Sequence, residues 1–129
     1  MKKFVPLFLS ALLFSGCVAS HNSAGSYRQI RMEQAVRMME RETDYVILDV
    51  RTPEEYAAGH IPGAINVPNE SIGTEEIPTL PVKDRLILVY CRSGRRSKEA
   101  AEKLVFLGYT NVVEFGGILD WTGETVSGE

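Results

Sequence analysis

The sequence predicts an α/β fold, with a mainly parallel sheet flanked by helices on both faces, from three observations. Strand and helix patterns alternate along the chain from Tyr27 onward, which is typical of parallel sheets. Segments 45–48 and 86–90 are continuous apolar runs, as expected for strands covered on both faces. Segments 31–41 and 94–107 carry apolar side chains at helical spacing, so each can lay one face on the sheet.

The first predicted elements are a weak strand over 27–30 and a helix over 31–41. The helix is indicated by apolar residues at positions i, i+3, i+4 and i+7, which are Met32, Ala35, Val36 and Met39. The buried strand 45–48 follows this helix. The first part of the domain is therefore predicted to run strand, helix, strand, with the second strand buried in the sheet.

A second, short helix is predicted directly after strand 45–48. Thr52 suits its N-cap, Pro53 its first position, and Glu55 completes a capping box. Gly59 ends this helix, and residues 64–67 form another short strand.

The segment 70–83 contains a glycine and two prolines, so it is predicted to be mostly loop, with a turn of helix. Residues 86–90 form the strongest predicted strand. The helix within 94–107 has Ala100, Ala101, Leu104 and Val105 on one face. It is stopped by Gly108.

Glu99 and Lys103 are spaced to form an i,i+4 pair on that helix. The last predicted strand is 112–115. Gly116-Gly117 is interpreted as a turn, and 118–121 as one helical turn.

The amino-terminal segment has the three parts of a secretory signal, namely positive charge, a short apolar run and small residues. Its apolar run is about half the roughly 20 residues that a membrane-spanning helix needs. The residues before Cys17 resemble a bacterial lipobox, with Phe14 where such motifs prefer leucine. We expect a signal peptide over 1–16, then a lipidated Cys17 and a flexible tether over 17–26. This predicts an exported cell-envelope lipoprotein on the periplasmic or extracellular face of a bacterial membrane.

The composition is that of one soluble domain, with 44% hydrophobic and 24% charged residues. The net charge of −3 and a pI of about 5.5 lack the basic imprint of a nucleic-acid-binding domain. Two cysteines, Cys17 and Cys91, are too few for a disulfide scaffold. No set of His, Cys and carboxylate residues has metal-site spacing, so neither a metal nor a cofactor is expected.

Cys91 is the residue that points to chemistry. It follows the strongest strand and enters a tight turn that begins a helix, where ligands of parallel sheets bind. Main-chain N–H groups of such a turn can form an anion-binding nest, and the helix N-terminus adds positive potential. Three arginines follow within five residues: Arg92, Arg95 and Arg96. This environment favours a thiolate over an inert core cysteine.

The sequence resembles the rhodanese family over about Tyr27 to Trp121. The matching string is Asp49-Val50-Arg51, Glu55-Tyr56, Gly59-His60-Ile61, Gly63-Ala64, Asn66 and Pro68, with the loop Cys91-Arg92-Ser93-Gly94-Arg95-Arg96-Ser97 and the later Gly108-Tyr109, Gly116-Gly117 and Trp121. The string around Asp49 is highly specific, whereas the cysteine loop alone is weaker evidence. Residues 27–129 are thereby interpreted as a rhodanese domain.

The resemblance implies a five-stranded, mainly parallel sheet and a persulfide carried on Cys91. A donor such as thiosulfate would give its outer sulfur to Cys91, and cyanide or a thiol would accept it. The substrate-binding residues implied are Arg92, Ser93, Gly94, Arg95, Arg96 and Ser97, whose backbone amides would cradle the persulfide. Arg92 and Arg96 are the side chains expected to meet the anionic donor, ahead of Arg95.

Other motif residues are expected to be structural. His60 is interpreted as shaping its turn, Asp49 and Arg51 as bonding to their surroundings, and Trp121 as packing.

Several alternatives stay open at this level. A cysteine-dependent phosphatase or arsenate reductase needs Cys-x5-Arg, but the sixth residue after Cys91 is Ser97. A thiol–disulfide oxidoreductase needs a second thiol, and no C-x-x-C is present. A persulfide carrier or protein-interaction module with little turnover is a further alternative. The sequence leaves the oligomeric state and the physiological donor and acceptor open.

Overall fold

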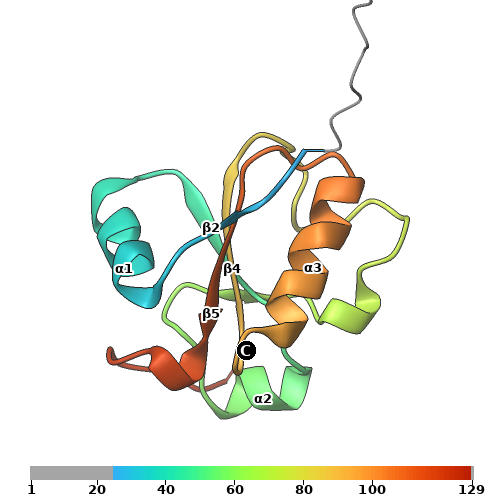
Figure 1. Cartoon of the computed structure of the whole chain (residues 1–129). Coiled ribbons are helices and arrows are strands. Elements are labelled where there is room, and N and C mark those ends of the chain that lie inside the picture. The colour runs from blue at the N-terminus through green and yellow to red at the C-terminus, as the bar shows by residue number, and fades with distance from the viewer. Residues whose placement is uncertain (1–24, 129) are drawn as a thin grey trace, which may run out of the picture.

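The computed structural model describes residues 25–128 (Figure 1). The predicted signal peptide, Cys17 and most of the predicted tether lie outside the described residues. The elements are β1 (Arg28–Gln29), α1 (Met32–Arg41), β2 (Tyr45–Asp49), α2 (Pro53–Ala58), β3 (Ile65–Asn66), the 3₁₀ turn η1 (Asn69–Ser71), β4 (Leu86–Cys91), α3 (Arg95–Phe106), β5 (Val112–Gly117) and the 3₁₀ turn η2 (Ile118–Asp120).

The five strands form one sheet in the order β1-β5-β4-β2-β3, and every pairing is parallel. The predicted α/β class and five-stranded sheet are confirmed. β4 is the central strand, and all six of its residues are buried. Since β4 ends at Cys91, this cysteine emerges from the middle of the sheet at its carboxyl edge.

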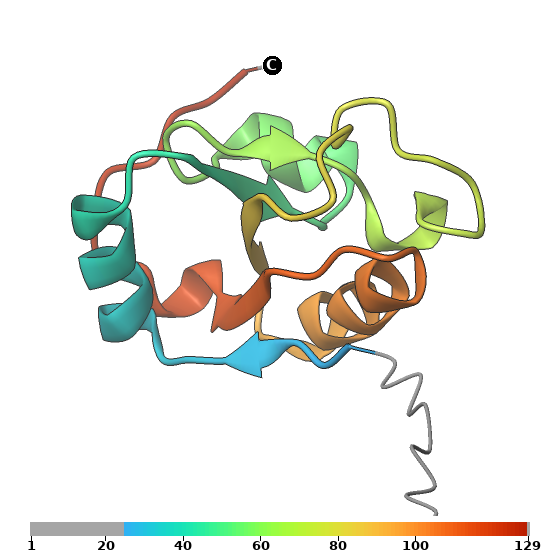
Figure 2. The ribbon, with the colours of Figure 1, turned by 90° about the horizontal axis from the view of Figure 1, so that it is seen from above.

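Helices cover both faces of the sheet, with α1 on one side and α3 on the other (Figure 2). Successive residues of β4 alternate between the two cores, as the pleat of a strand requires. Leu88 and Tyr90 pack on the α1 side, whereas Val89 and Cys91 pack on the α3 side. The side chain of Cys91 therefore points to the face of the sheet that α3 covers.

α2 begins and ends as its sequence predicts. The hydroxyl of Thr52 accepts the Glu55 amide at 3.2 Å, and the Glu55 carboxylate accepts the Thr52 amide at 3.4 Å. Pro53 occupies the first turn, and Gly59 is the C-cap. This local capping fixes the position of Glu55 beside the cysteine loop.

The predicted turn at Gly116-Gly117 is wrong, because both glycines belong to β5. The register between β4 and β5 shifts between Val89 and Cys91, and Gly116 has a φ of 94°. A glycine in the left-handed region within a strand is typical of a β-bulge. The bulge brings Gly117 opposite Cys91.

The predicted contact between Glu99 and Lys103 is replaced by contacts that each makes with Asn69. The Asn69 amide donates to Glu99 at 2.9 Å, and the Lys103 ammonium donates to the Asn69 main-chain and side-chain oxygens at 2.9 and 3.0 Å. Arg95 pairs with Glu99 at 3.0 Å. Through Asn69, Glu99 and Lys103 therefore hold η1 against α3.

A buried polar network lies where β2 and β4 end. The carboxylate of Asp49, fully buried, binds the Arg51 guanidinium at 2.7 Å and accepts the Tyr90 hydroxyl at 2.7 Å. Tyr90 accepts the Ile61 amide at 3.1 Å, and Arg51 donates to the Gly59 carbonyl at 2.7 Å. Burial, followed by the bond to Asp49, raises the pKa of Tyr90, which stays a neutral donor.

The remaining residues of the motif complete this scaffold. Asn66 donates to the carbonyls of Asp49 and Arg51, both at 3.0 Å. Tyr56 donates to the Ala64 carbonyl at 2.7 Å and stacks on His60 with ring centroids 3.7 Å apart. The motif around Asp49 therefore fastens the loops after β2 to the sheet, as the structural interpretation of Asp49 and Arg51 predicts.

No helix within residues 25–128 combines the length and the apolar character that crossing a bilayer requires.

Candidate active site

Cys91 lies under the turn that joins β4 to α3. Its side chain is 1% exposed. The Gly94 amide donates to the sulfur at 3.0 Å, and the thiol donates to the Ser97 hydroxyl at 3.3 Å. The sulfur therefore has one main-chain donor and one hydroxyl partner within the loop.

Gly94 shapes this turn. It has a φ of 118°, in the left-handed region that side-chain-bearing residues avoid, and α3 starts at the next residue. The N-terminus of this 12-residue helix carries partial positive charge beside the sulfur. The predicted sequence of strand, tight turn and helix is confirmed.

The three arginines have different surroundings. Arg95 is exposed and pairs with Glu99. Arg96 forms two bonds to the Glu55 carboxylate, at 2.6 and 3.0 Å. Arg92 is exposed and forms no ion pair with any of the described residues. Arg96 therefore lies near the loop but is bound to Glu55 on α2. Among the described residues, Arg92 has no carboxylate partner.

The Arg96 guanidinium has a marked effect on Glu55. Its hydrogen bonds are the largest cause and, together with the bond from the Thr52 amide, outweigh burial, which raises the pKa. The pKa of Glu55 therefore lies at about 2, below the usual 4.5. Because the folded-state pKa is depressed, the ion pair stabilises the fold above about pH 4.5. That contribution is lost as the pH falls toward about 2.

We expect Glu55→Gln to lower the free energy of unfolding at neutral pH by about 1 to 2 kcal/mol, the partial exposure of the pair being taken into account. Glutamine can keep the capping box, so the change isolates the charge. Urea titrations from pH 7 downward should show the difference from wild type shrinking between about pH 4.5 and about pH 2. Glu54→Gln, in the same turn of α2, is the control. A difference independent of pH would contradict the role of the ion pair.

The loop is tied to the end of β5 by close backbone contact. The Arg92 carbonyl accepts the Leu119 amide at 3.3 Å. A methyl group at Gly117 would lie 2.0 Å from the Arg92 oxygen and 2.5 Å from the Ser93 nitrogen. Only glycine leaves the space that this part of the loop occupies.

Ser97 and Glu114 form a second layer behind the sulfur. Ser97 is fully buried, and Glu114 is 2% exposed. The Ser97 hydroxyl lies 2.6 Å from the Glu114 carboxylate, which also accepts the Gly116 amide at 2.8 Å. Sequence reasoning missed Glu114. The available signal was a charged residue inside the apolar run Val112-Val113-Glu114-Phe115.

An open depression of about 400 Å³ lies over the carboxyl edge of the sheet, next to the loop. It is lined by Arg51, Glu55, Ala58, Gly59, Arg92, Ile118, Leu119 and Thr125. Leu119 is 62% exposed at this surface. The depression thus offers apolar side chains together with the guanidinium of Arg92, which has no ion-pair partner within residues 25–128.

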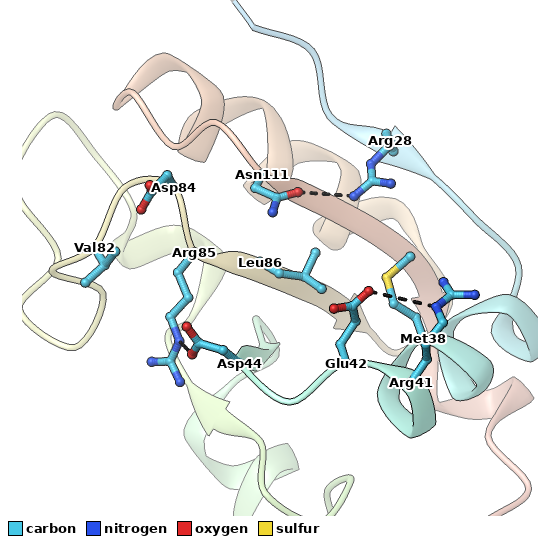
Figure 3. Close-up of a pocket in the computed structure, with 10 residues that line it drawn as sticks. All are labelled: Arg28, Met38, Arg41, Glu42, Asp44, Val82, Asp84, Arg85, Leu86 and Asn111. Atoms are coloured by element: carbon cyan, nitrogen blue, oxygen red, sulfur yellow. Dashed lines mark hydrogen bonds and ion pairs between the residues drawn. The ribbon is translucent and has the colours of Figure 1, made fainter.

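Another depression, of about 370 Å³, lies at the amino-terminal ends of β2, β4 and β5 (Figure 3). Its charged side chains are largely paired with their neighbours. Arg85 binds Asp44 at 2.8 Å, and Arg28 donates to Asn111 at 3.1 Å. It lies at the opposite edge of the sheet from Cys91, so it takes no part in the candidate site.

The other predicted residues lie where a structural role places them. The Nδ1 atom of His60 is 2.8 Å from the Tyr56 carbonyl, and its ring is buried in the turn after α2. Trp121 packs against the core on the α1 side, and its indole N–H donates to the Glu124 carbonyl at 2.9 Å. Among residues 25–128 no three His, Cys, Asp or Glu side chains are grouped as metal ligands.

The fold and this cysteine loop define a family, and comparison with known proteins identifies it. The rhodanese-like domain model matches residues 32–124, and the chain belongs to this family.

Individual relatives are similar over most of the domain. The thiosulfate sulfurtransferase PspE of Escherichia coli is 40% identical over 63% of this chain and 78% of that protein. The thiosulfate sulfurtransferase GlpE of Pseudomonas entomophila is 36% identical over 80% of this chain and 91% of that protein. A solved structure of a rhodanese with anions from E. coli has a TM-score of 0.59 and 41% identity, covering 65% of this chain and 99% of that one.

Proposed function

We propose that the chain is a rhodanese-type sulfurtransferase that takes sulfane sulfur from thiosulfate or a related donor. In the first half-reaction the Cys91 thiolate attacks the outer sulfur of thiosulfate. A sulfur–sulfur bond forms on Cys91, the bond to the sulfonate sulfur breaks, and sulfite leaves with the electron pair. Cyanide or a thiolate then attacks the outer sulfur and releases the Cys91 thiolate.

The observation that carries this proposal is the bond from the Gly94 amide to the Cys91 sulfur, at 3.0 Å. It directs a main-chain donor at a sulfur atom that also lies at the start of α3. Donors fixed before the reaction stabilise negative charge on a thiolate or persulfide without reorganisation. The names of the relatives PspE and GlpE support the same reaction class.

Arg92 is our candidate for the side chain that meets the anionic donor. It lines the depression next to the loop and has no carboxylate partner among the described residues. The sequence also predicts that Arg96 meets the donor. Since Glu55 holds it by two bonds, we assign it the lesser part.

The phosphatase alternative is less well supported. The residue that would clamp a tetrahedral anion is replaced by Ser97, whose hydroxyl is turned to the sulfur and to Glu114. A persulfide carrier with little turnover uses the same loop, so steady-state kinetics with small acceptors separates a carrier from an enzyme.

The test is mass spectrometry of the intact protein after incubation with thiosulfate. We expect a gain of one sulfur atom that cyanide removes. Cys91→Ala should show no gain, whereas the control Cys17→Ser should gain sulfur as the wild type does. A wild type that stays unmodified and hydrolyses aryl phosphates would reverse the assignment in favour of a phosphatase.

We further propose that the chain is exported and anchored by a lipid on Cys17, which lies outside the described residues. The support is the signal-like segment 1–16 and its resemblance to a lipobox. Cys17→Ser should move the protein from the membrane fraction to the soluble fraction. Unchanged fractionation would contradict the anchor.

A further inference from the structure

We propose that Ser97 and Glu114 form a proton relay that removes the proton from the Cys91 thiol, with Glu114 as a positioning residue that acts only through Ser97. The inference rests on the function proposed above, because it concerns how the same thiol becomes a nucleophile. The Gly94 turn and the bond from the Gly94 amide to the sulfur do not involve Glu114. They therefore do not explain why a carboxyl group lies behind Ser97.

Glu114 is unusual for its burial. Its side chain lies in the central part of the sheet, 2% exposed, and it forms no ion pair with any residue of 25–128. Its partners are the Gly116 amide at 2.8 Å and the Ser97 hydroxyl at 2.6 Å. A buried carboxyl group without a cation is costly, which favours a role beyond packing for Glu114.

The hydrogen-bond geometry gives the relay its direction. The Ser97 hydroxyl has one proton and three oxygen neighbours: Glu114 at 2.6 Å, the Gly94 carbonyl at 2.9 Å and the Gly116 carbonyl at 3.3 Å. A length of 2.6 Å is typical of a hydroxyl that donates to a carboxylate. When Ser97 donates to Glu114, its oxygen is left to accept the Cys91 thiol, which lies at 3.3 Å.

The proton balance of the step is simple. The thiol proton of Cys91 moves to the Ser97 oxygen, and the Ser97 proton moves to the Glu114 carboxylate. One S–H bond breaks, one O–H bond forms on Glu114, and Ser97 exchanges one proton for another. The site holds one negative charge before and after, on the carboxylate and then on the sulfur.

This constant charge suits the buried setting. Two negative charges close together in a medium of low dielectric constant repel strongly, so a transfer that keeps the site at one negative charge avoids this repulsion. During the persulfide phase Glu114 would hold the proton, and it would return the proton when an acceptor has freed the thiolate. The Gly94 amide donates to the sulfur in both states.

Other ionisable groups around the relay are few. Arg92 and Arg96 lie on the loop side. The pKa of Arg96 is raised mainly by its hydrogen bonds to Glu55, and Cys91 adds to this. Tyr27 lies before β1, and its pKa is raised by burial first and also by Glu102 and Glu114. None of these groups lies within hydrogen-bond distance of the Ser97 hydroxyl.

The test compares the rate at which iodoacetamide alkylates Cys91, located by peptide mass spectrometry, in the full chain. We expect Glu114→Gln to lower this rate about 10- to 100-fold at neutral pH. Near pH 10 ordinary thiols ionise without a base, so the variant and the wild type should react alike at about that pH. Glu99→Gln, a carboxyl-to-amide change on the outer side of α3, should behave as the wild type does.

Ser97→Ala breaks the relay at its other member and should give the same pH-dependent loss. The double variant should be no slower than either single variant, since the two residues act as one unit. If Glu114→Gln fails to fold, Ser97→Ala alone decides by the same comparison.

Two results would overturn the relay. One is alkylation of Glu114→Gln at or above the wild-type rate at neutral pH. The other is an equal loss at neutral and high pH, which would indicate altered access to the sulfur. Sulfur loading from thiosulfate, measured on the same samples, separates the two proposals. A wild type that takes up no sulfur ends the proposed function, while the alkylation rates still decide whether the relay exists.

Discussion

Gly117→Ala is expected to reduce sulfur loading of Cys91 by about 100-fold, because the added methyl group displaces the cysteine loop. The added methyl group would lie 2.0 Å from the Arg92 oxygen and 2.2 Å from the Arg92 carbonyl carbon. These are backbone atoms, so the cysteine loop itself must move. A displacement of about 1 Å in a reactive site can cost about two orders of magnitude in rate.

The same substitution should lower the free energy of unfolding by about 3 kcal/mol, which is the upper end of the losses typical of overpacked sites. Urea denaturation and time-resolved mass spectrometry after addition of thiosulfate measure the two effects. Gly73→Ala is a matched control, because no atom lies within 4 Å of its added methyl group and its φ is not in the left-handed region. Loading of Gly117→Ala at the wild-type rate would show that the contact with Arg92 does not hold the loop in place.

Asp49→Ala is expected to destabilise the fold by about 3 to 5 kcal/mol. It would leave the Arg51 guanidinium, 7% exposed, without its carboxylate, and the Tyr90 hydroxyl without its acceptor. Removing one partner of a buried pair costs more than the pair contributes, since the other charge stays buried and unpaired.

Equilibrium unfolding in urea measures this effect. Asp44→Ala is the matched control. Asp44 binds Arg85 at 2.8 Å, a similar distance, but is 80% exposed. Such surface pairs contribute about 0 to 1 kcal/mol. Similar losses for the two variants would contradict the importance of the buried network.

Local signals in the sequence were sufficient for the elements that depend on neighbours along the chain. The capping box of α2 joins residues three apart, and the cysteine turn joins adjacent elements, so both could be predicted. The pairing of Arg96 with Glu55 spans 41 residues and depends on how α2 sits at the carboxyl edge of the sheet. No local pattern indicates that contact, and the expected role of Arg96 changed accordingly.

The last strand was the hardest to predict. A pair of glycines commonly marks a turn, but Gly116 and Gly117 continue β5 through a bulge. The absence of a side chain at Gly117 lets the backbone of the cysteine loop, which follows β4, lie close to β5. Glu114 was missed for the same reason, because its partner Ser97 lies on α3 and the register of β5 sets the contact.

The dependence of the loop on β5 also has a consequence for biosynthesis. Cys91 leaves the ribosome before Glu114 and Gly117 do, so the nascent chain carries this thiol before the strand that completes its surroundings exists. The thiol gains the Glu114 member of the proposed relay only when β5 is inserted beside β4. Chains that stop short of β5 would keep the Gly94 amide beside the sulfur but would lack Glu114, the proton acceptor of the proposed relay.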